Sequence, residues 1–304
     1  MKKSKTLFLY LICFFTITML FSSCSKKNSD DNSNWYLNSI SVNKLWNYSK
    51  GDSQTIAFID TGLSEEYQKY LNNRIVYKYN VVSKNDNVTD NHGHGTEMVS
   101  VVAGNSNYGI TGIAENAKIM IIKAVDDEGK TTGAHLADAI DCAINHNATI
   151  INISLGGYKS FDNVIAKIKT AVSKNITVVA AAGDYGNKDL LFPANIDNVI
   201  SVEGKTKENK IWENSNTSDS CVFAFPATEI NVLSISTDNS MKKNTVSGTS
   251  ESSALASGYI AIIKDYASSK SIPLTNQQII EFLKGTNSLS EKSDYLYPLN
   301  QLEK

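Results

Sequence analysis

Short runs of apolar residues, many of them β-branched, alternate with helical patterns along most of this chain. Continuous apolar runs of this kind are typical of strands that are covered on both faces, as in a parallel sheet. Segments between them carry apolar residues at a spacing of three to four, which predicts helices. The predicted strands are 55–60, 117–124, 148–155, 176–182 and 198–203, and the predicted helices are 133–147, 162–175, 250–268 and 276–284.

This alternation predicts an α/β fold of three layers, with a mostly parallel central sheet and helices on both faces. Thr275 and Gln278 form a capping-box pattern at the start of the last predicted helix. A further short helix is expected to begin at His94 and to end at Gly104. No linker-like stretch interrupts residues 35–304, so we expect them to form one domain.

The N-terminal segment is not expected to belong to the fold. Three lysines precede the apolar run 7–21, and the small residues Ser22 and Ser23 follow it. This order is typical of a secretion signal, and the run is shorter than the roughly 20 residues that a membrane-spanning helix needs. Because Cys24 comes next, "LFSSC" is similar to a bacterial lipobox, in which the cysteine is lipidated. Residues 1–24 are therefore interpreted as a signal ending at Cys24; ordinary cleavage and a retained anchor are the alternatives, and all three place the body outside the cytoplasm.

Composition adds three expectations. Residues 25–34 are polar and charged, which predicts a solvated tether. The formal net charge of −2 gives no electrostatic reason to bind nucleic acid. Cys142 and Cys221 lie in apolar patterns and are predicted to be two buried free thiols rather than a disulfide.

Ligands meet open parallel sheets at the carboxyl ends of the strands, and three candidate groups are predicted to lie there. Asp60 ends the strand 55–60, although an acid in this place is often a simple turn former. From spacing alone, His92 and His94 are compatible with a metal clamp, a catalytic base or a polar loop, and zinc would need further ligands. Ser250 opens a long helix, where it is either an N-cap or a hydroxyl facing the positive helix end.

Taken together, Asp60 in "IDTG", His94 in "GHGT" and Ser250 in "SGTS" resemble, in this order, the subtilisin-like serine proteases. The resemblance continues through "INISLGG", "VVAAAG" and "FPANIDNVISV". It implies that Ser250 is the nucleophile, that His94 is the general base and then acid, and that Asp60 orients His94. It leaves His92 as a loop residue near the cleft.

The resemblance also implies a substrate-binding cleft with two walls. One wall pairs with an extended peptide and the other closes the pocket for the residue before the cut. A cis peptide bond is expected at Phe192–Pro193. The wall residues are Ser154, Leu155, Gly156 and Gly157 on one side and Ala181, Ala182 and Gly183 on the other.

This chain departs from the family pattern at several positions. Asp184 stands where the family has the asparagine that, with the Ser250 N–H, forms the oxyanion hole, and an ionised carboxylate there would repel the oxyanion. Glu251, beside the nucleophile, is expected to face the leaving-group side of the substrate. The loop 105–110 is one residue shorter than the family's calcium loop, so structural calcium is doubtful, and no metal or cofactor is expected. No propeptide domain is recognisable.

These features predict an extracytoplasmic, membrane-tethered serine endopeptidase that acts as a monomer on an extended peptide or protein. Two roles stay open within this prediction: general protein turnover, and the selective processing of a leader peptide, as lanthipeptide leader proteases of this family perform it. A non-catalytic peptide-binding lipoprotein on the same scaffold is the alternative, because of Asp184. A metal-dependent hydrolase built on His92 and His94 is a second rival.

Overall fold

The fold is described from a computed structural model of the chain, which covers residues 11–12, 34–238, 240–288 and 295–303. Of the predicted signal and tether, only residues 11, 12 and 34 fall within these ranges, and Cys24 lies outside them. The helices are α1 Trp35–Ser39, α2 Val42–Leu45, α3 Glu65–Leu71, α4 His94–Ala103, α5 Gly133–Asn145, α6 Asp162–Ser173, α7 Thr249–Ser269, α8 Asn276–Ser288 and α9 Tyr297–Leu302, with 3-10 turns η1 Asn72–Arg74 and η2 Ser106–Tyr108.

A seven-stranded sheet with the order β3-β4-β2-β6-β7-β8-β9 forms the centre of the molecule, and each neighbouring pair in it is parallel. A hairpin of β10 and β11 and a short antiparallel pair of β1 and β5 lie apart from it. The strands are β1 Leu11–Ile12, β2 Thr55–Asp60, β3 Ile75–Asn80, β4 Lys118–Lys123, β5 Lys130–Thr131, β6 Ile150–Ile153, β7 Thr177–Ala181, β8 Ile200–Lys205, β9 Phe223–Pro226, β10 Ile230–Ile235 and β11 Met241–Val246.

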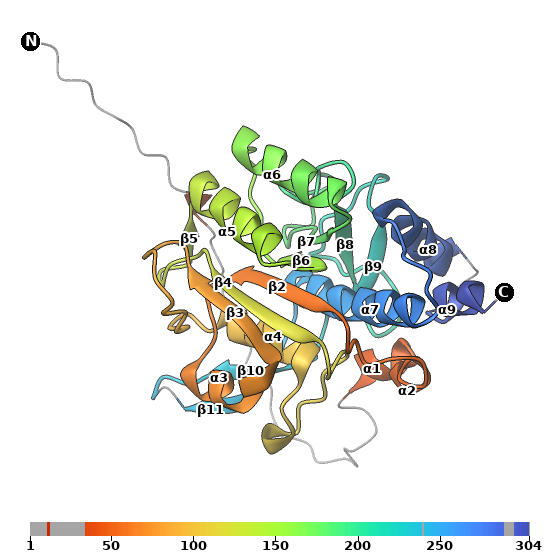
Figure 1. The fold of residues 1–304 in the computed structure, drawn as a ribbon, viewed down its shortest axis with the longest axis horizontal. Coiled ribbons are helices and arrows are strands. Elements are labelled where there is room, and N and C mark those ends of the chain that lie inside the picture. The colour runs from red at the N-terminus through yellow and green to blue at the C-terminus, as the bar shows by residue number, and fades with distance from the viewer. Residues whose placement is uncertain (1–10, 13–33, 239, 289–294, 304) are drawn as a thin grey trace, which may run out of the picture.

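Helices cover both faces of this sheet, as the sequence predicts (Figure 1). One hydrophobic cluster joins α4, α7 and α8 to one face of the sheet, and a second cluster joins α5 and α6 to the other. Figure 1 shows α5 and α6 together on one side, with α7 running along the opposite side. The predicted α/β fold of three layers is therefore confirmed.

Helix α7 is buried over most of its length and carries small residues where it meets its neighbours. A Cβ on Gly258 would lie 2.3 Å from Ile113 Cγ2, so only glycine allows this contact. Near its start, Ser253 and Ser257 join the helix to β6: Ser257 Oγ donates to Asn152 Oδ1 at 3.1 Å, and Ser253 Oγ lies 2.9 Å from Ser154 Oγ. These contacts fix the helix that begins at the candidate active site.

The structure settles several smaller expectations. The Thr275–Gln278 capping box is present, because Thr275 N–H donates to Gln278 Oε1 at 2.9 Å and Gln278 N–H to Thr275 Oγ1 at 3.2 Å. The Phe192–Pro193 peptide bond is cis. Cys142 and Cys221 are free, but each is half-buried rather than fully buried as predicted.

Candidate active site

Three adjacent parallel strands end at one edge of the sheet, and several candidate residues lie at or just after their carboxyl ends. β6 lies between β2 and β7, so their carboxyl ends are neighbours. Asp60 is the last residue of β2, Ser154 follows β6, and Asp184 follows β7 after a short turn. The topology therefore brings together side chains that are far apart in the sequence.

Asp60 and His94 form a buried pair at this edge. Asp60 Oδ1 lies 2.7 Å from His94 Nδ1, and both side chains are almost fully buried. Burial lowers the pKa of the His94 imidazole, but the charge and hydrogen bond of Asp60, with smaller contributions from Glu251 and Glu97, raise it above its ordinary value. An imidazole held in this way keeps its Nδ1 side towards Asp60 and leaves Nε2 for proton transfer.

The loop before α4 is held by Asp90, which the sequence analysis did not single out. Asp90 Oδ1 accepts hydrogen bonds from the N–H groups of His92 and Gly93, at 3.1 and 2.7 Å. Asp90 Oδ2 accepts from the N–H and the hydroxyl of Thr96, at 2.9 and 2.7 Å. One buried carboxylate therefore fixes both the loop and the first turn of the helix that carries His94. The only sequence signal is an aspartate three residues before a glycine, which is common in polar loops.

Ser250 is the second residue of α7 and is buried at the same edge. Its hydroxyl donates to the carbonyl oxygen of Ser154 at 3.2 Å, and the Ser154 hydroxyl donates to the Ser250 carbonyl oxygen at 3.1 Å. Helices α4 and α7 pack against each other, and Glu251 interacts electrostatically with His94. The structure thus places Asp60 in contact with His94, and Ser250 in the first turn of a helix that packs against α4.

Asp184 binds the first residue of α7 rather than pointing to solvent. Its Oδ1 accepts from the N–H and the hydroxyl of Thr249, each at 2.8 Å, and the Thr249 hydroxyl in turn accepts from Gly183 N–H at 3.1 Å. Burial raises the pKa of the Asp184 carboxyl, although the Thr249 hydrogen bonds and the charge of His94 act in the opposite direction. Asp184 Oδ2, which takes no part in these bonds, lies 3.3 Å from the point that a Cβ would occupy on Gly248.

A second residue outside the sequence prediction supports the Asp184 loop. Asn216 is fully buried, and its Oδ1 accepts from Tyr185 N–H at 2.9 Å. Its Nδ2 donates to the carbonyl oxygen of Asp189 at 2.8 Å. Both ends of the loop after Asp184 are therefore tied to one side chain from another segment, and spacing along the chain gives no sign of this contact.

Glu251 is buried, with 4% of its surface exposed. Its Oε2 lies 2.6 Å from the Cβ point of Gly248, close to Asp184 Oδ2. Burial, opposed by the charge of His94, raises the pKa of the Glu251 carboxyl to about 8. The Glu251 carboxyl interacts electrostatically with His94, Glu97 and Asp184. That it faces the leaving-group side of a substrate stays a prediction.

The two predicted walls of the substrate cleft both contact the segment 191–192. Phe192 and Gly157 exchange two backbone hydrogen bonds, of 2.9 and 3.0 Å, and Leu191 N–H donates to Ala182 O at 3.0 Å. Gly156 and Gly157 are half-exposed, so a peptide backbone can approach them. The Ser154 side chain turns to α7 rather than to the cleft. The remaining predicted wall residues are buried: Ser154, Leu155, Ala181, Ala182 and Gly183.

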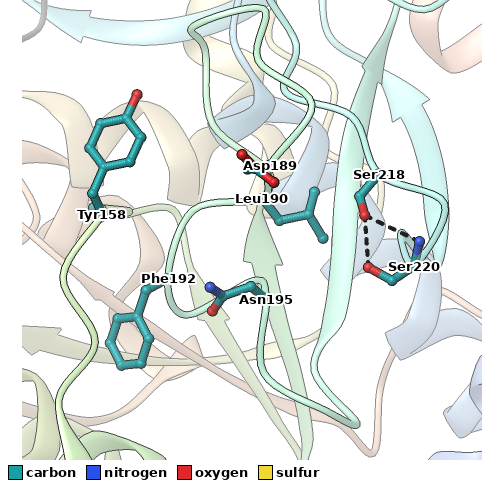
Figure 2. A pocket seen from close by; sticks show the side chains of 8 residues that line it. Tyr158, Asp189, Leu190, Phe192, Asn195, Ser218 and Ser220 are labelled. Carbon is teal, nitrogen blue, oxygen red and sulfur yellow. Dashed lines mark hydrogen bonds between the residues drawn. The ribbon is translucent and has the colours of Figure 1, made fainter.

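A hollow of about 370 Å³ adjoins this segment and the wall residue Gly157 (Figure 2). Tyr158, Leu190 and Phe192 line it, together with Asn195 and two serines, Ser218 and Ser220. Figure 2 shows Leu190 and Phe192 with their side chains beside this hollow. Leu191, which lies between them in the sequence, is not part of its lining.

His92 and His94 have different surroundings. His94 Nδ1 faces Asp60, whereas His92 is exposed and its Nε2 lies 3.1 Å from the Cβ point of Gly129. Within the described ranges, no group of three or more His, Cys, Asp or Glu side chains is arranged to hold a metal ion. The hydrolase rival built on this histidine pair therefore receives no support from the geometry.

A model of the subtilase family matches residues 51–297 of the chain. The chain belongs to this family. This subtilase is 31% identical over 239 residues to the minor extracellular protease Epr of Bacillus subtilis. The matched region covers 78% of this chain but 36% of that protein. The subtilase is also 31% identical over 228 residues to the major intracellular serine protease of B. subtilis, covering 71% of the chain and 70% of that protein.

Comparison with solved structures shows the same architecture. A cold-adapted subtilisin-like serine proteinase matches with a TM-score of 0.68 and 23% identity, over 80% of this chain and 86% of that one. The subtilisin-like fold is thus shown. In the part of the subtilase that the structure describes, no helix is long and apolar enough to cross a bilayer.

Proposed function

We propose that this subtilase is a serine endopeptidase in which Asp60, His94 and Ser250 cleave peptide bonds through an acyl-enzyme. The observation that carries the proposal is the 2.7 Å contact of Asp60 Oδ1 with His94 Nδ1, at the sheet edge where Ser250 lies in the first turn of α7. Serine is a weak nucleophile until a base accepts its proton, and this imidazole is oriented for that role.

The reaction follows from these positions. His94 Nε2 takes the Ser250 hydroxyl proton while Ser250 Oγ attacks the carbonyl carbon of the scissile bond. His94 then gives that proton to the leaving amine as the C–N bond breaks. A water molecule, deprotonated by His94, attacks the acyl carbon, and the regenerated Ser250 hydroxyl recovers its proton from His94. Asp60 stabilises the imidazolium in both halves of the reaction.

The oxyanion is stabilised by the Ser250 N–H and by a protonated Asp184. Ser250 lies in the first turn of α7, so its N–H has no carbonyl partner within the helix. Asp184 Oδ1 is engaged by Thr249, which leaves Oδ2 to carry a proton and donate it in a hydrogen bond to the oxyanion. The raised pKa of Asp184 favours this protonated form.

An active-site probe tests the proposal. A fluorophosphonate should label the purified protein at Ser250, and the label should be lost in Ser250→Ala and in His94→Ala. Chelators should leave labelling unchanged, because no step uses a metal. Absence of labelling in a correctly folded wild-type protein would favour the alternative of a non-catalytic peptide-binding protein.

We also propose an exported, lipid-anchored enzyme that processes a selected peptide, such as a leader, rather than degrading proteins in general. The signal pattern ending at Cys24 supports export, and a carboxyl in the oxyanion hole supports slow, selective cleavage. Cys24→Ala should move the protein from the detergent phase to the aqueous phase in a detergent partition experiment. Cleavage of unfolded casein at many unrelated sites would argue for general turnover instead.

A further inference from the structure

Leu191 occupies the space between the two walls that are predicted to hold the substrate residue before the cut, called P1. Its Cδ1 lies 2.9 Å from the Cβ point of Gly156 on one wall and 2.7 Å from the Cβ point of Gly183 on the other. Contact as close as this is possible because neither wall residue has a side chain. Leu191 itself is only 5% exposed.

The backbone fixes Leu191 in this place. Leu191 N–H is bonded to Ala182 on one wall, and the next residue, Phe192, exchanges two hydrogen bonds with Gly157 on the other. The segment therefore links both walls across the base of the pocket. Neighbouring side chains of an extended segment point to opposite sides, and Leu190 and Phe192, but not Leu191, line the hollow of Figure 2. Leu191 is left to point between the walls.

We infer that Leu191 determines specificity by closing the P1 pocket, so that this subtilase accepts glycine, alanine or serine at P1 and excludes aromatic and long aliphatic side chains. The inference rests on the proposed endopeptidase function, because it assigns the substrate class of that site. A closely packed interior accommodates an extra large side chain only with displacement of its neighbours, which disfavours large P1 residues.

The test compares peptide anilides that differ only at P1, with Gly, Ala, Leu or Phe. Wild type should cleave the Ala anilide with a kcat/KM at least about tenfold above that for Phe. Leu191→Ala should raise kcat/KM for Leu and Phe by about tenfold or more, with little gain for Gly. Leu190→Ala is the matched control: it removes the same side chain from the neighbouring position, which faces the hollow, and should leave the P1 order unchanged.

The same anilides should be titrated by calorimetry against Ser250→Ala and against Ser250→Ala/Leu191→Ala, after thermal unfolding has shown that both are folded. This binding experiment does not need catalysis. If Ser250→Ala binds small P1 residues better, if this preference is lost with Leu191, and if wild type cleaves none of the anilides, the proposed hydrolysis is rejected. The inference that Leu191 closes the P1 pocket would then still stand. The inference would be overturned if proteins that retain Leu191 accepted the Phe anilide as well as or better than the Ala anilide. It would also be overturned if Leu191→Ala left the order of preference among the P1 residues unchanged.

Discussion

At the scale of single residues, the two acidic side chains around Gly248 distinguish this subtilase most clearly. Asp184 Oδ1 is a fixed acceptor for Thr249, so the chemistry of the oxyanion hole depends on whether Oδ2 carries a proton. Ionisation converts a donor into a charge that repels the oxyanion. kcat/KM of the wild type should therefore fall as pH rises through the raised pKa of Asp184.

Asp184→Asn tests this dependence directly. Asn Oδ1 can still accept from Thr249, and its Nδ2 then donates from the position of Asp184 Oδ2 at every pH. We expect activity equal to or above wild type at neutral pH, with a gain approaching 100- to 1,000-fold at alkaline pH. pH profiles of kcat/KM for both proteins measure the effect. A large loss at all pH values would mean that the carboxyl has a positive role that an amide cannot fill.

Glu251 is predicted to make folding stability depend on pH. Its pKa is about 8 in the folded protein against an ordinary value of 4.5, so between these values the folded state holds a proton that the unfolded state has lost. The free energy of unfolding therefore falls as pH rises from about 4.5 to 8. Glu251→Gln should remove this fall, so that its stability relative to the parent improves by on the order of a few kcal/mol between pH 5 and pH 8.

Urea unfolding measures this difference, with both variants in a Ser250→Ala background to prevent self-digestion. Glu128→Gln serves as the control, because Glu128 is exposed and should show the same pH dependence as the parent. A parallel pH dependence of Glu251→Gln and the parent would show that Glu251 is not the group that titrates.

Some of these residues could be predicted from the sequence and others could not. Asp60, His94 and Ser250 stand at the end of a strand or the start of a helix, in an order that a known family shares. Asp90 holds its loop by accepting four hydrogen bonds. The sequence does not reveal this role, because acidic residues are common in polar loops. The role of Leu191 depends on which side of its segment it faces, and that is set by backbone hydrogen bonds to Ala182 and, through Phe192, to Gly157.

At the scale of elements, the continuous apolar runs located both ends of β2, β4, β6, β7 and β8 to within two residues. The same criterion misses β3, because this edge strand alternates: Val76 and Lys78 are exposed while Tyr77 and Tyr79 contact the core. It also misses β11, whose residues are mostly polar and exposed. Such strands exist because a partner pairs with them, and composition does not encode the partner.

The start of α4 gives a prediction at this scale. Asp90→Ala would leave the N–H groups of His92, Gly93 and Thr96 without their acceptor, and Gly93 and Thr96 are buried. We expect a loss of about 2–4 kcal/mol in the free energy of unfolding and a lower kcat, because the base His94 is no longer held in place.

Asp90→Asn is the informative comparison. Its Oδ1 can still accept from His92 and Gly93, but its amide nitrogen faces the Thr96 N–H and cannot accept from it. Stability and kcat should therefore fall between those of Asp90→Ala and wild type, when urea unfolding and anilide turnover are measured together. An Asp90→Ala protein with wild-type kcat would show that the loop positions His94 without this carboxylate.

At the scale of the whole molecule, the N-terminal helices are joined to the rest of the domain at several points. Trp35 Nε1 donates to Thr228 O at 3.0 Å, beyond β9, and Trp46 Nε1 donates to Ile113 O at 2.9 Å. Ser49 Oγ donates to Asp265 Oδ2 on α7 at 2.6 Å. The helix α7 itself contacts β2, β6, β7, β8 and β9, so these links reach most strands of the central sheet.

Because of these links, residues 35–303 should unfold as one unit, although chains of this size often unfold through intermediates. In a Ser250→Ala/Trp212→Phe protein, fluorescence reports only Trp35 and Trp46, and circular dichroism reports the helices throughout. The two urea transitions should coincide, since the N-terminal helices cannot detach without exposing the buried face of Trp35 and breaking their bonds to α7 and to the loop after β9. A fluorescence transition at clearly lower urea would show instead that this segment is a separate, weaker unit docked on the peptidase core.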